Sequence, residues 1–418
     1  MELRRGHVLV VWVAVVAVGL VVGDHVLRPL HVGLDAAPFA GRWRDPSVGW
    51  LARLVGPAAV AGAVVAWGPS AARRLRWALV PPLAGLAAIA WAVALAATDG
   101  WSRLTAPLTT RFEYEPFAAR LHDPGRFLRT FVDRSAGYPI HVQGHPPGAP
   151  LLAWALDHVG LAGAGWWAAL VLAGWGAAVA AVLVAVRTVG DEASARRAAP
   201  ALVLLPAAVW AGTSVDALFA GVLAVGIALA LLGRRRHALV GGVVLGVALL
   251  LTYGGAVLVL VPIGLHLLRR RPAHAALVAA GTVLTLMAIW AGTGFWWLGG
   301  LRATRHLYWA GIASQRPTAY LALLGNPTVL VVAVGPAAAV GLVEAWRARP
   351  VWPAALPLAA LAAVTLADVS LLSKGEVERI WLPFAVWIGA AAVTDRRRWL
   401  AAQAAVGLAA QALVLSPW

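Results

Sequence analysis

The sequence has no cysteine and few charged residues, and both absences restrict what the protein can be. Without cysteine, the chain cannot form disulfides, thiolate metal sites or a cysteine nucleophile. Charged residues make up 12% of its 418 residues, whereas a soluble protein carries roughly 25%. The P-loop, the HExxH zinc motif and the GxSxG nucleophile motif are also missing. The composition excludes an ordinary soluble domain, and no soluble-enzyme motif supplies a function.

Hydrophobic residues make up 61% of the chain and gather in long apolar runs from end to end. Such runs predict an all-α polytopic membrane protein, because only helices and closed barrels satisfy their backbone groups in lipid. Hydropathy gives about thirteen candidate transmembrane helices. They lie near 8–23, 50–67, 77–97, 162–186, 198–212, 214–233, 238–252, 254–268, 274–292, 322–346, 352–370, 380–394 and 399–416.

The net charge of +16 comes almost entirely from arginine, since Lys374 is the single lysine. In a soluble chain this charge would suggest nucleic acid as a partner, but here the arginines cluster in every second turn between apolar runs. This is the positive-inside pattern of a multi-pass cell-membrane protein, so we expect no nucleic-acid binding. It predicts a cytoplasmic N-terminus, an extracytoplasmic C-terminus and an extracytoplasmic position for segment 98–148, which follows the third span.

Segment 98–148 is the one long polar stretch of the chain. Loops of this length in a compact protein are usually either functional or disordered. Disorder is not expected, because the segment has aromatic residues that can anchor it: Trp101, Phe112, Tyr114, Phe117, Phe127, Phe131 and Tyr138. We therefore expect a folded extracytoplasmic lid, with an interrupted amphipathic helix over 115–131 and a short helix over 149–158.

Within this lid, Glu113 and Glu115 flank a tyrosine, and either carboxylate could accept a proton from a hydroxyl or help to hold a divalent cation. They could equally be ordinary solvated carboxylates. His141 and His145 could bind a phosphate, a sugar or a metal ion, or could simply cap the helix that enters the membrane. Two histidines at this spacing, outside a regular helix, are weak evidence for zinc.

Further polar residues stand at the outer ends of the predicted spans. Asp216 lies at a helix start, where helix capping explains it in part. Lys374, Glu376 and Arg379 form a turn that could bind a lipid-linked phosphate, or could form salt bridges among themselves. Arg302 and Arg305 belong to a basic and aromatic patch that could bind such a phosphate or form an interfacial belt.

Four of these stretches carry a resemblance to a known family: F-E-Y-E-P, H-V-Q-G-H-P-P-G, T-S-V-D-A-L-F-A-G and K-G-E-V-E-R-I-W-L-P-F. In order and spacing they resemble the GT-C superfamily of integral-membrane glycosyltransferases, and most closely GT-C-like membrane proteins of actinobacteria. The resemblance covers roughly residues 77–394. It implies a GT-C-like membrane domain over 77–418, with residues 1–76 as an N-terminal addition of two spans.

The resemblance further implies a sugar transfer from a polyprenyl-phosphate donor to an extracytoplasmic acceptor, with inversion at the anomeric carbon. Its catalytic carboxylate would be Glu113 or Glu115. Asp99 is a third candidate, because the superfamily often has an aspartate directly after the preceding helix. Cations at Arg302, Arg305, Lys374 or Arg379 would bind the phosphate, with His141, His145, Asp216 and Glu376 nearby. Whether a divalent metal ion is a cofactor stays open.

Two other classes fit the same membrane architecture. A transporter or lipid flippase would need many spans without catalysis, but such proteins generally have inverted repeats and ionisable groups at the membrane midplane. The sequence has no evident repeat, and its carboxylates collect outside. A membrane scaffold or an inactive enzyme homologue is the other alternative.

Overall fold

The computed structural model describes residues 2–348 and 352–418, which are mostly helical. Within these ranges, six helical segments are long and apolar enough to cross a membrane. They are Arg5–Leu30, Val48–Arg74, Trp77–Asp99, Ala164–Val189, Pro272–Thr293 and Thr318–Arg347. Three shorter apolar helices accompany them: Asp216–Leu231, Ala256–Leu268 and Ala354–Val369. The protein is therefore an α-helical membrane protein, as its composition predicts.

Eleven of the predicted spans correspond to helices of the structure. These are α1 (Glu2–Leu27), α3 (Val55–Arg74), α4 (Val80–Ala96), α10 (Ala164–Val189), α13 (Asp216–Leu231), α14 (Arg235–Ala248), α15 (Ala256–Leu268), α16 (Pro272–Thr293), α19 (Asn326–Ala348), α20 (Trp352–Val369) and α23 (Arg397–Leu413).

The other two predicted spans, 198–212 and 380–394, are not continuous helices. The first is divided between α11 (Glu192–Val203) and α12 (Ala208–Ala211), and the break contains Pro206, which cannot donate a helical hydrogen bond. The second holds the end of α21 (Val377–Ile380) and α22 (Leu382–Gly389). At 1.5 Å per residue, α22 is far too short for a hydrocarbon core of about 30 Å.

The broken helices meet each other inside the protein, where their backbone groups find partners. The N–H of Ala207, in the break before α12, donates to the carbonyl of Ala333 in α19. Helix α19 is itself kinked at Gly335, whose φ of 77° is in the left-handed region that favours glycine. The side chain of Gln403 bridges this kink by bonding Val334 and Ala337. At these two breaks the irregular backbone lies in the protein interior, where a bilayer tolerates it.

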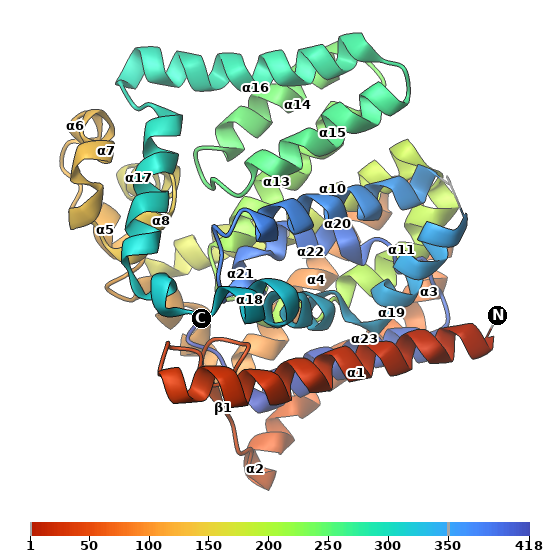
Figure 1. Cartoon of the computed structure of the whole chain (residues 1–418). Helices are drawn as coiled ribbons and strands as arrows, with labels where there is room; N and C mark the ends of the chain where they lie inside the picture. The colour runs from red at the N-terminus through yellow and green to blue at the C-terminus, as the bar shows by residue number, and fades with distance from the viewer. Residues whose placement is uncertain (1, 349–351) are drawn as a thin grey trace.

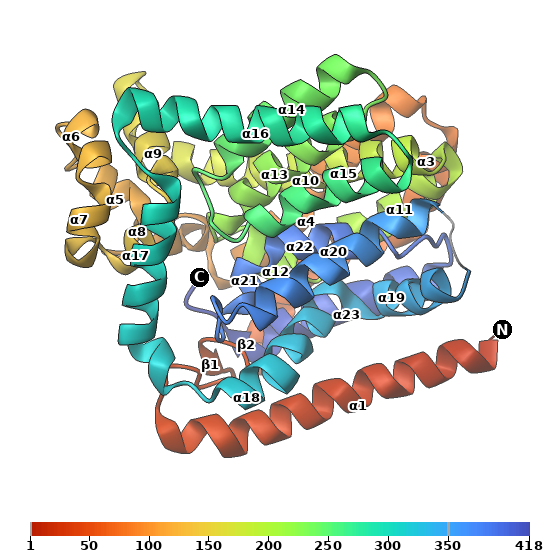
Figure 2. The same cartoon turned by 45° about the horizontal axis from the view of Figure 1, so that its top comes forward.

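The helices run broadly in the same direction, so the molecule has two ends (Figures 1 and 2). The N-terminus and the turn between α10 and α11, which has Arg187 on one side and Arg196 and Arg197 on the other, lie at one end. The C-terminus, the lid helices and α17 (Trp297–Ala310) lie at the other. Arg103 of the lid bonds the carbonyl groups of Ser416 and Trp418, which ties the C-terminus to this end. We call these the arginine end and the lid end.

Small residues let the central helices approach closely. Helix α10 packs against α4 and α13, and a Cβ added to Gly221 of α13 would lie 2.4 Å from the carbonyl oxygen of Gly174 in α10. Close contact through glycine is a common way to pack helices in a membrane, where burial of apolar surface does not drive association. Large side chains fill the remaining core, and Trp91, Trp175 and Trp387 are buried around this centre.

The lid is built from short helices around an aromatic core. Its helices are α5 (Tyr114–Ala118), α6 (Pro124–Arg129), α7 (Phe131–Arg134), α8 (Ile140–Gly144) and α9 (Gly148–His158), so the predicted amphipathic helix is interrupted and the short helix near 149–158 is present. Phe127 packs against Phe117, Phe131 and Tyr138 with ring centroids 5.3–5.4 Å apart. Trp101 and Phe112 do not belong to this core, because their side chains are exposed.

The remaining elements are short, apart from α1, and bring the N-terminal and C-terminal segments of the chain together. Strand β1 (Arg42–Trp43) pairs antiparallel with β2 (Val414–Leu415), and the short helix α2 (Val48–Leu51) follows β1. Helix α18 (Thr318–Tyr320) leads into α19 through a π-helical turn, Leu321–Gly325. Helix α1 packs along α19, so the N-terminal residues contact the C-terminal half of the chain.

Candidate functional site

The lid brings Glu113 and His141 into contact. Glu113 directly precedes α5 and His141 lies in α8, and the Nδ1 atom of His141 is 2.7 Å from Oε1 of Glu113. Both side chains are largely withdrawn from solvent, with exposed fractions of 15% for His141 and 10% for Glu113. The pair is therefore a fixed contact within the lid.

The neighbours of His141 determine which of its nitrogens carries the proton. Its Nε2 lies 3.4 Å from an NH2 group of Arg379, and a guanidinium group can only donate hydrogen bonds. Nε2 must therefore accept, and in the neutral imidazole Nδ1 carries the hydrogen and donates to Glu113. This arrangement orients the Glu113 carboxylate without neutralising it.

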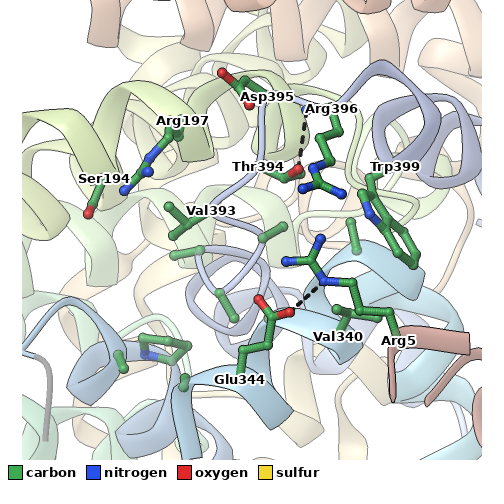
Figure 3. A pocket seen from close by; sticks show the side chains of 18 residues that line it. Arg5, Ser194, Arg197, Val340, Glu344, Val393, Thr394, Asp395, Arg396 and Trp399 are labelled. Atoms are coloured by element: carbon green, nitrogen blue, oxygen red, sulfur yellow. Dashed lines mark hydrogen bonds and ion pairs between the residues drawn. The ribbon is translucent and has the colours of Figure 1, made fainter. Parts of the chain in front are cut away.

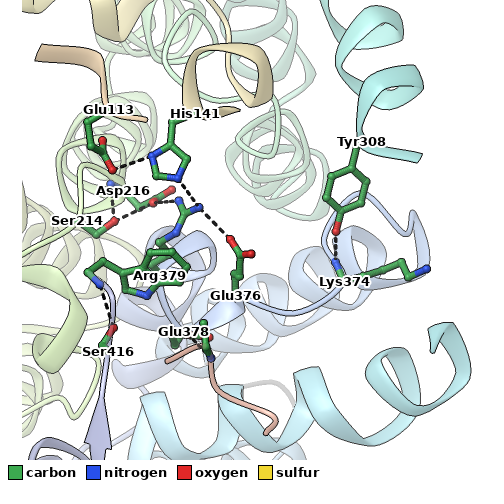
Figure 4. Close-up of polar contacts among 12 residues, drawn as sticks. Glu113, His141, Ser214, Asp216, Tyr308, Lys374, Glu376, Glu378, Arg379 and Ser416 are labelled. Atoms are coloured by element: carbon green, nitrogen blue, oxygen red, sulfur yellow. Dashed lines mark hydrogen bonds and ion pairs between the residues drawn. The ribbon is translucent and has the colours of Figure 1, made fainter. Parts of the chain in front are cut away.

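Arg379 is the centre of the cluster, as Figure 4 shows. Its guanidinium donates to Oδ2 of Asp216 at 2.9 Å and to Oε2 of Glu376 at 3.2 Å. Asp216 begins α13, where it also accepts from the hydroxyl of Ser214 at 2.8 Å, and that hydroxyl accepts from the N–H of Asp216 as a capping residue would. Residues from four distant parts of the chain thus share one ion-pair network. We call Glu113, His141, Asp216, Glu376 and Arg379 the lid-end cluster.

The backbone at Glu376 adopts an unusual conformation to place its carboxylate. Its φ is 62°, in the left-handed region that few residues other than glycine adopt, and the preceding Gly375 has a φ of 82°. The carboxylate of Glu376 then lies between Arg379 and Arg316. An NH2 group of Arg316 is 2.8 Å from its Oε1 atom. Burial opposes the charge of Glu376, but Arg379 and Arg316 outweigh it and lower the pKa to about 2. Backbone strain of this kind is concentrated at functional sites.

Aromatic rings enclose the cluster. Trp418 lies over the guanidinium of Arg379 at 4.4 Å, a cation–π contact. The rings of Tyr114, His145 and Phe219 pack against one another, with centroids 5.2–6.3 Å apart. Burial lowers the pKa of His145 to about 4, so this histidine is neutral at physiological pH. Its Nδ1 faces the carbonyl of Leu251 at 3.2 Å and must carry the proton to bond it. The remaining nitrogen then has no hydrogen to donate to a phosphate.

Two atoms in the cluster are buried without a partner. Among the residues that the structure describes, Oε2 of Glu113 and Nε of Arg379 have no hydrogen-bond partner. A buried carboxylate oxygen without a hydrogen bond destabilises the folded state, so such a group in a folded protein requires an explanation. A substrate hydroxyl that donates a hydrogen bond to Oε2 would explain it.

Two of the candidate carboxylates lie outside the cluster. Asp99 accepts from Arg44 at 2.7 Å and from the indole of Trp50 at 3.0 Å, so it is committed to the N-terminal segment. Burial raises the pKa of Glu115, and the nearby negative charge of Asp157 in α9 adds to this effect. Of the three candidates for the catalytic carboxylate, only Glu113 contacts the other cluster residues.

The candidate phosphate-binding residues are divided between two places. Arg302 and Arg305 are exposed on one face of α17, where they line a shallow, open hollow of about 560 Å³ together with His306 and Trp309. Lys374 is 1% exposed and its Nζ lies 4.5 Å from the centre of the Trp309 ring, on the border of the same region. We call this region the α17 cavity. Arg379, in contrast, is engaged by carboxylates.

A chain of contacts links the α17 cavity to the cluster. The hydroxyl of Tyr308, on α17, accepts from the N–H of Lys374. The carbonyl of Lys374 accepts from Arg316 at 2.7 Å, and Arg316 bonds Glu376 of the cluster. Arg316 and Trp418 were not predicted from the sequence. Each is an isolated residue outside any polar motif, and only its position beside the cluster distinguishes it.

Glu378 is a second buried carboxyl beside the cluster, 1% exposed, and its Oε1 accepts from the N–H of Ala40 at 2.9 Å. Burial is the main cause that raises its pKa to about 7, and the charge of Glu376 adds to it.

Because the ordinary pKa of a glutamate is near 4.3, the folded state keeps a proton on Glu378 over a pH range where the unfolded chain has lost it. Stability should therefore fall as the pH rises from about 4.5 to about 7, by on the order of 2–3 kcal/mol. Glu378→Gln, which keeps the acceptor for Ala40, should remove this loss. Thermal unfolding of the wild type and of Glu378→Gln in detergent, at pH 5 and pH 8, measures this loss of stability. An equal loss in the two proteins would show that Glu378 is not its cause.

The donor set does not fit a divalent metal ion. Within residues 2–348 and 352–418, no three histidine, aspartate or glutamate side chains are grouped so as to hold one. The carboxylates of Asp216 and Glu376 point at the guanidinium of Arg379, which occupies the position that a cation would take.

No known protein family matches the chain, and a search of curated proteins finds no match to its sequence.

Proposed function

We propose that the protein is a membrane glycosyltransferase that transfers a sugar from a polyprenyl-phosphate donor to an extracytoplasmic acceptor. The observation that carries the proposal is the carboxylate of Glu113. One of its oxygens is held by His141, and the other is buried and unsatisfied within the described structure. A group fixed in this way is suited to accept a proton from a positioned hydroxyl, which is the task of a general base.

In the proposed reaction, Oε2 of Glu113 accepts the proton of the acceptor hydroxyl. The hydroxyl oxygen forms a bond to the anomeric carbon, on the face opposite the phosphate. The bond between that carbon and the phosphate oxygen breaks, its electron pair leaves with the lipid phosphate, and the anomeric configuration inverts. Glu113 later releases its proton to solvent. His141, which donates to Oε1, keeps Oε2 directed at the hydroxyl.

The α17 cavity suits the leaving phosphate better than the cluster does. The cluster has the carboxylates of Glu113, Asp216 and Glu376, which outnumber its guanidinium group, Arg379, even when the neighbouring Arg316 is added. In the cavity, Arg302 and Arg305 are exposed beside Trp309, so their charges can stabilise the phosphate as it leaves.

If the cavity binds the donor phosphate, Arg302→Gln together with Arg305→Gln should raise the KM for the lipid donor by about 10–100-fold, because a hydrogen bond to a charged group contributes roughly 1.5–3 kcal/mol. The kcat should fall as well, because the same charges stabilise the phosphate as it leaves. Steady-state kinetics in proteoliposomes measures both constants. Arg126→Gln together with Arg129→Gln, on α6 of the lid, is the control for lost positive charge. An unchanged KM would place the phosphate elsewhere.

The proposed orientation follows from charge. The arginine-rich turns lie at the end of the molecule that holds the N-terminus, and the lid lies at the opposite end (Figure 2). The positive-inside rule therefore supports a multi-pass cell-membrane protein with a cytoplasmic arginine end and an extracytoplasmic lid.

The experiment that tests the function is mass spectrometry of envelope glycans and lipids from a deletion strain. We expect one sugar modification to disappear on deletion and to return with the wild-type gene. An unchanged envelope, together with movement of a labelled lipid or solute across proteoliposomes, would instead establish a transporter or flippase.

A further inference from the structure

A second cavity lies at the arginine end, far from the lid. It has a volume of about 390 Å³, is partly open, and is lined by α1, α11, α19, α20 and the segment that leads into α23. Figure 3 shows its charged residues: Arg5 from α1, Arg197 from α11 and Arg396 just before α23. None of these residues takes part in the proposed transfer. We call this space the arginine-end cavity.

Positive charge exceeds negative charge around this cavity. Its two carboxylates are both engaged, because Glu344 is 2.6 Å from Nε of Arg5 and Asp395 is 3.1 Å from Arg73, which does not line the cavity. Arg197 and Arg396 add two further guanidinium groups, and the guanidinium groups of Arg5 and Arg396 turn toward the same space (Figure 3). Guanidinium groups that converge on one space form a binding site for a phosphate-like anion, which can accept several of their donors at once.

The rest of the wall is apolar. Val340, Pro357, Ala391 and Trp399 line the cavity beside the arginines. A site for a free inorganic anion has no use for such a wall, whereas a phospholipid headgroup joins a phosphate to apolar chains. The side of α1 away from the protein is also apolar, with Val10, Val11 and Val13 exposed, so acyl chains beside this helix would be in a suitable environment.

We propose that the arginine-end cavity binds a phosphate-bearing anion, and that this anion is the headgroup of an anionic phospholipid from the adjoining leaflet. Basic pockets between membrane helices commonly hold such headgroups. By bridging α1, α11 and the start of α23, the lipid would fasten the N-terminal helix to the core. This site is independent of the chemistry at the lid.

Thermal unfolding of the full chain in detergent tests the proposal. Phosphatidylglycerol, phosphatidylcholine and inorganic phosphate are added separately to the wild type and to the double variant Arg197→Gln/Arg396→Gln. We expect phosphatidylglycerol to raise the Tm of the wild type well above the effect of phosphatidylcholine, as a ligand that binds only the folded state does. The double variant should lose more than about half of that rise.

Controls separate this site from general attraction to a basic surface. Arg234→Gln/Arg236→Gln removes two exposed arginines that do not line the cavity and should keep the full rise. Ala345→Phe narrows the cavity without changing charge and should lose the rise, which covers the case that the arginine variant folds poorly. Glu113→Gln should keep it, so failure here and failure of the transferase proposal are distinguishable.

Two results would change the assignment. A rise caused by inorganic phosphate alone, and lost in both cavity variants, would support the anion site but overturn the lipid as its source. A phosphatidylglycerol effect that is equal in the wild type and both cavity variants would overturn the site itself.

Discussion

Glu113→Gln should lower the rate of sugar transfer by about 10²–10⁴-fold, the range that a positioned general base contributes. The substitution preserves shape, and its amide oxygen can still accept from Nδ1 of His141, which is 2.7 Å from the present carboxylate. It removes only the ability of Oε2 to take a proton. The donor KM should therefore change little while kcat falls. Single-turnover transfer from lipid-linked sugar in proteoliposomes measures the effect.

Glu115→Gln is the matched control for this prediction. It lies two residues away in the same lid, but its charge interacts with Asp157 and not with the cluster. We expect near wild-type transfer from this variant, and the envelope of a deletion strain should be restored by Glu115→Gln but not by Glu113→Gln. If Glu113→Gln were fully active, or if Glu115→Gln were the inactive variant, Glu113 would not be the base.

Arg379→Met should destabilise the protein by about 3–5 kcal/mol, because breaking a buried ion pair leaves its partners charged and unpaired. The carboxylate left without a cation is Asp216, at 2.9 Å, whereas Glu376, at 3.2 Å, keeps its ion pair with Arg316. Arg379 is 7% exposed, so water cannot easily replace the lost bonds. Arg379→Lys should be intermediate, since an ammonium group keeps the charge but lacks the planar fork that reaches several acceptors. Unfolding in mixed detergent micelles measures the free energy.

The double variant Arg379→Met/Asp216→Asn tests whether the loss is electrostatic. Arg379→Met leaves the carboxylate of Asp216 buried, charged and without its ion-pair partner. Asp216→Asn removes that charge, so the double variant should be more stable than Arg379→Met alone. Losses that simply add would show that Arg379 acts through packing against Trp418, 4.4 Å from its guanidinium, and not through its charge.

Local patterns predicted much of the architecture. Apolar runs located eleven helices to within about seven residues at either end, because a membrane span is a property of one continuous stretch. The division of 198–212 around Pro206 was missed, since its composition is apolar throughout. At this break the N–H of Ala207 donates to the carbonyl of Ala333 in α19 instead of to a carbonyl of its own helix. No pattern within 198–212 refers to that distant helix.

The candidate site divides in the same way. The sequence marked Glu113, Asp99 and Glu115 as equivalent carboxylates of one polar loop, and their residue types do not distinguish them. Their neighbours do: His141 beside Glu113, Arg44 beside Asp99, and the charge of Asp157 near Glu115. Arg316 was not predicted at all, because its importance lies in the 2.8 Å contact with Glu376.

The sequence alone determined that this is a helical membrane protein whose polar residues gather in one long segment between apolar runs. Hydropathy and charge act over neighbouring residues, so they can be read in order along the chain. Only the tertiary structure decided which polar residues meet. The free energy of a buried charge depends on the groups within a few ångströms, and those of Arg379 come from α13, the lid and the C-terminus.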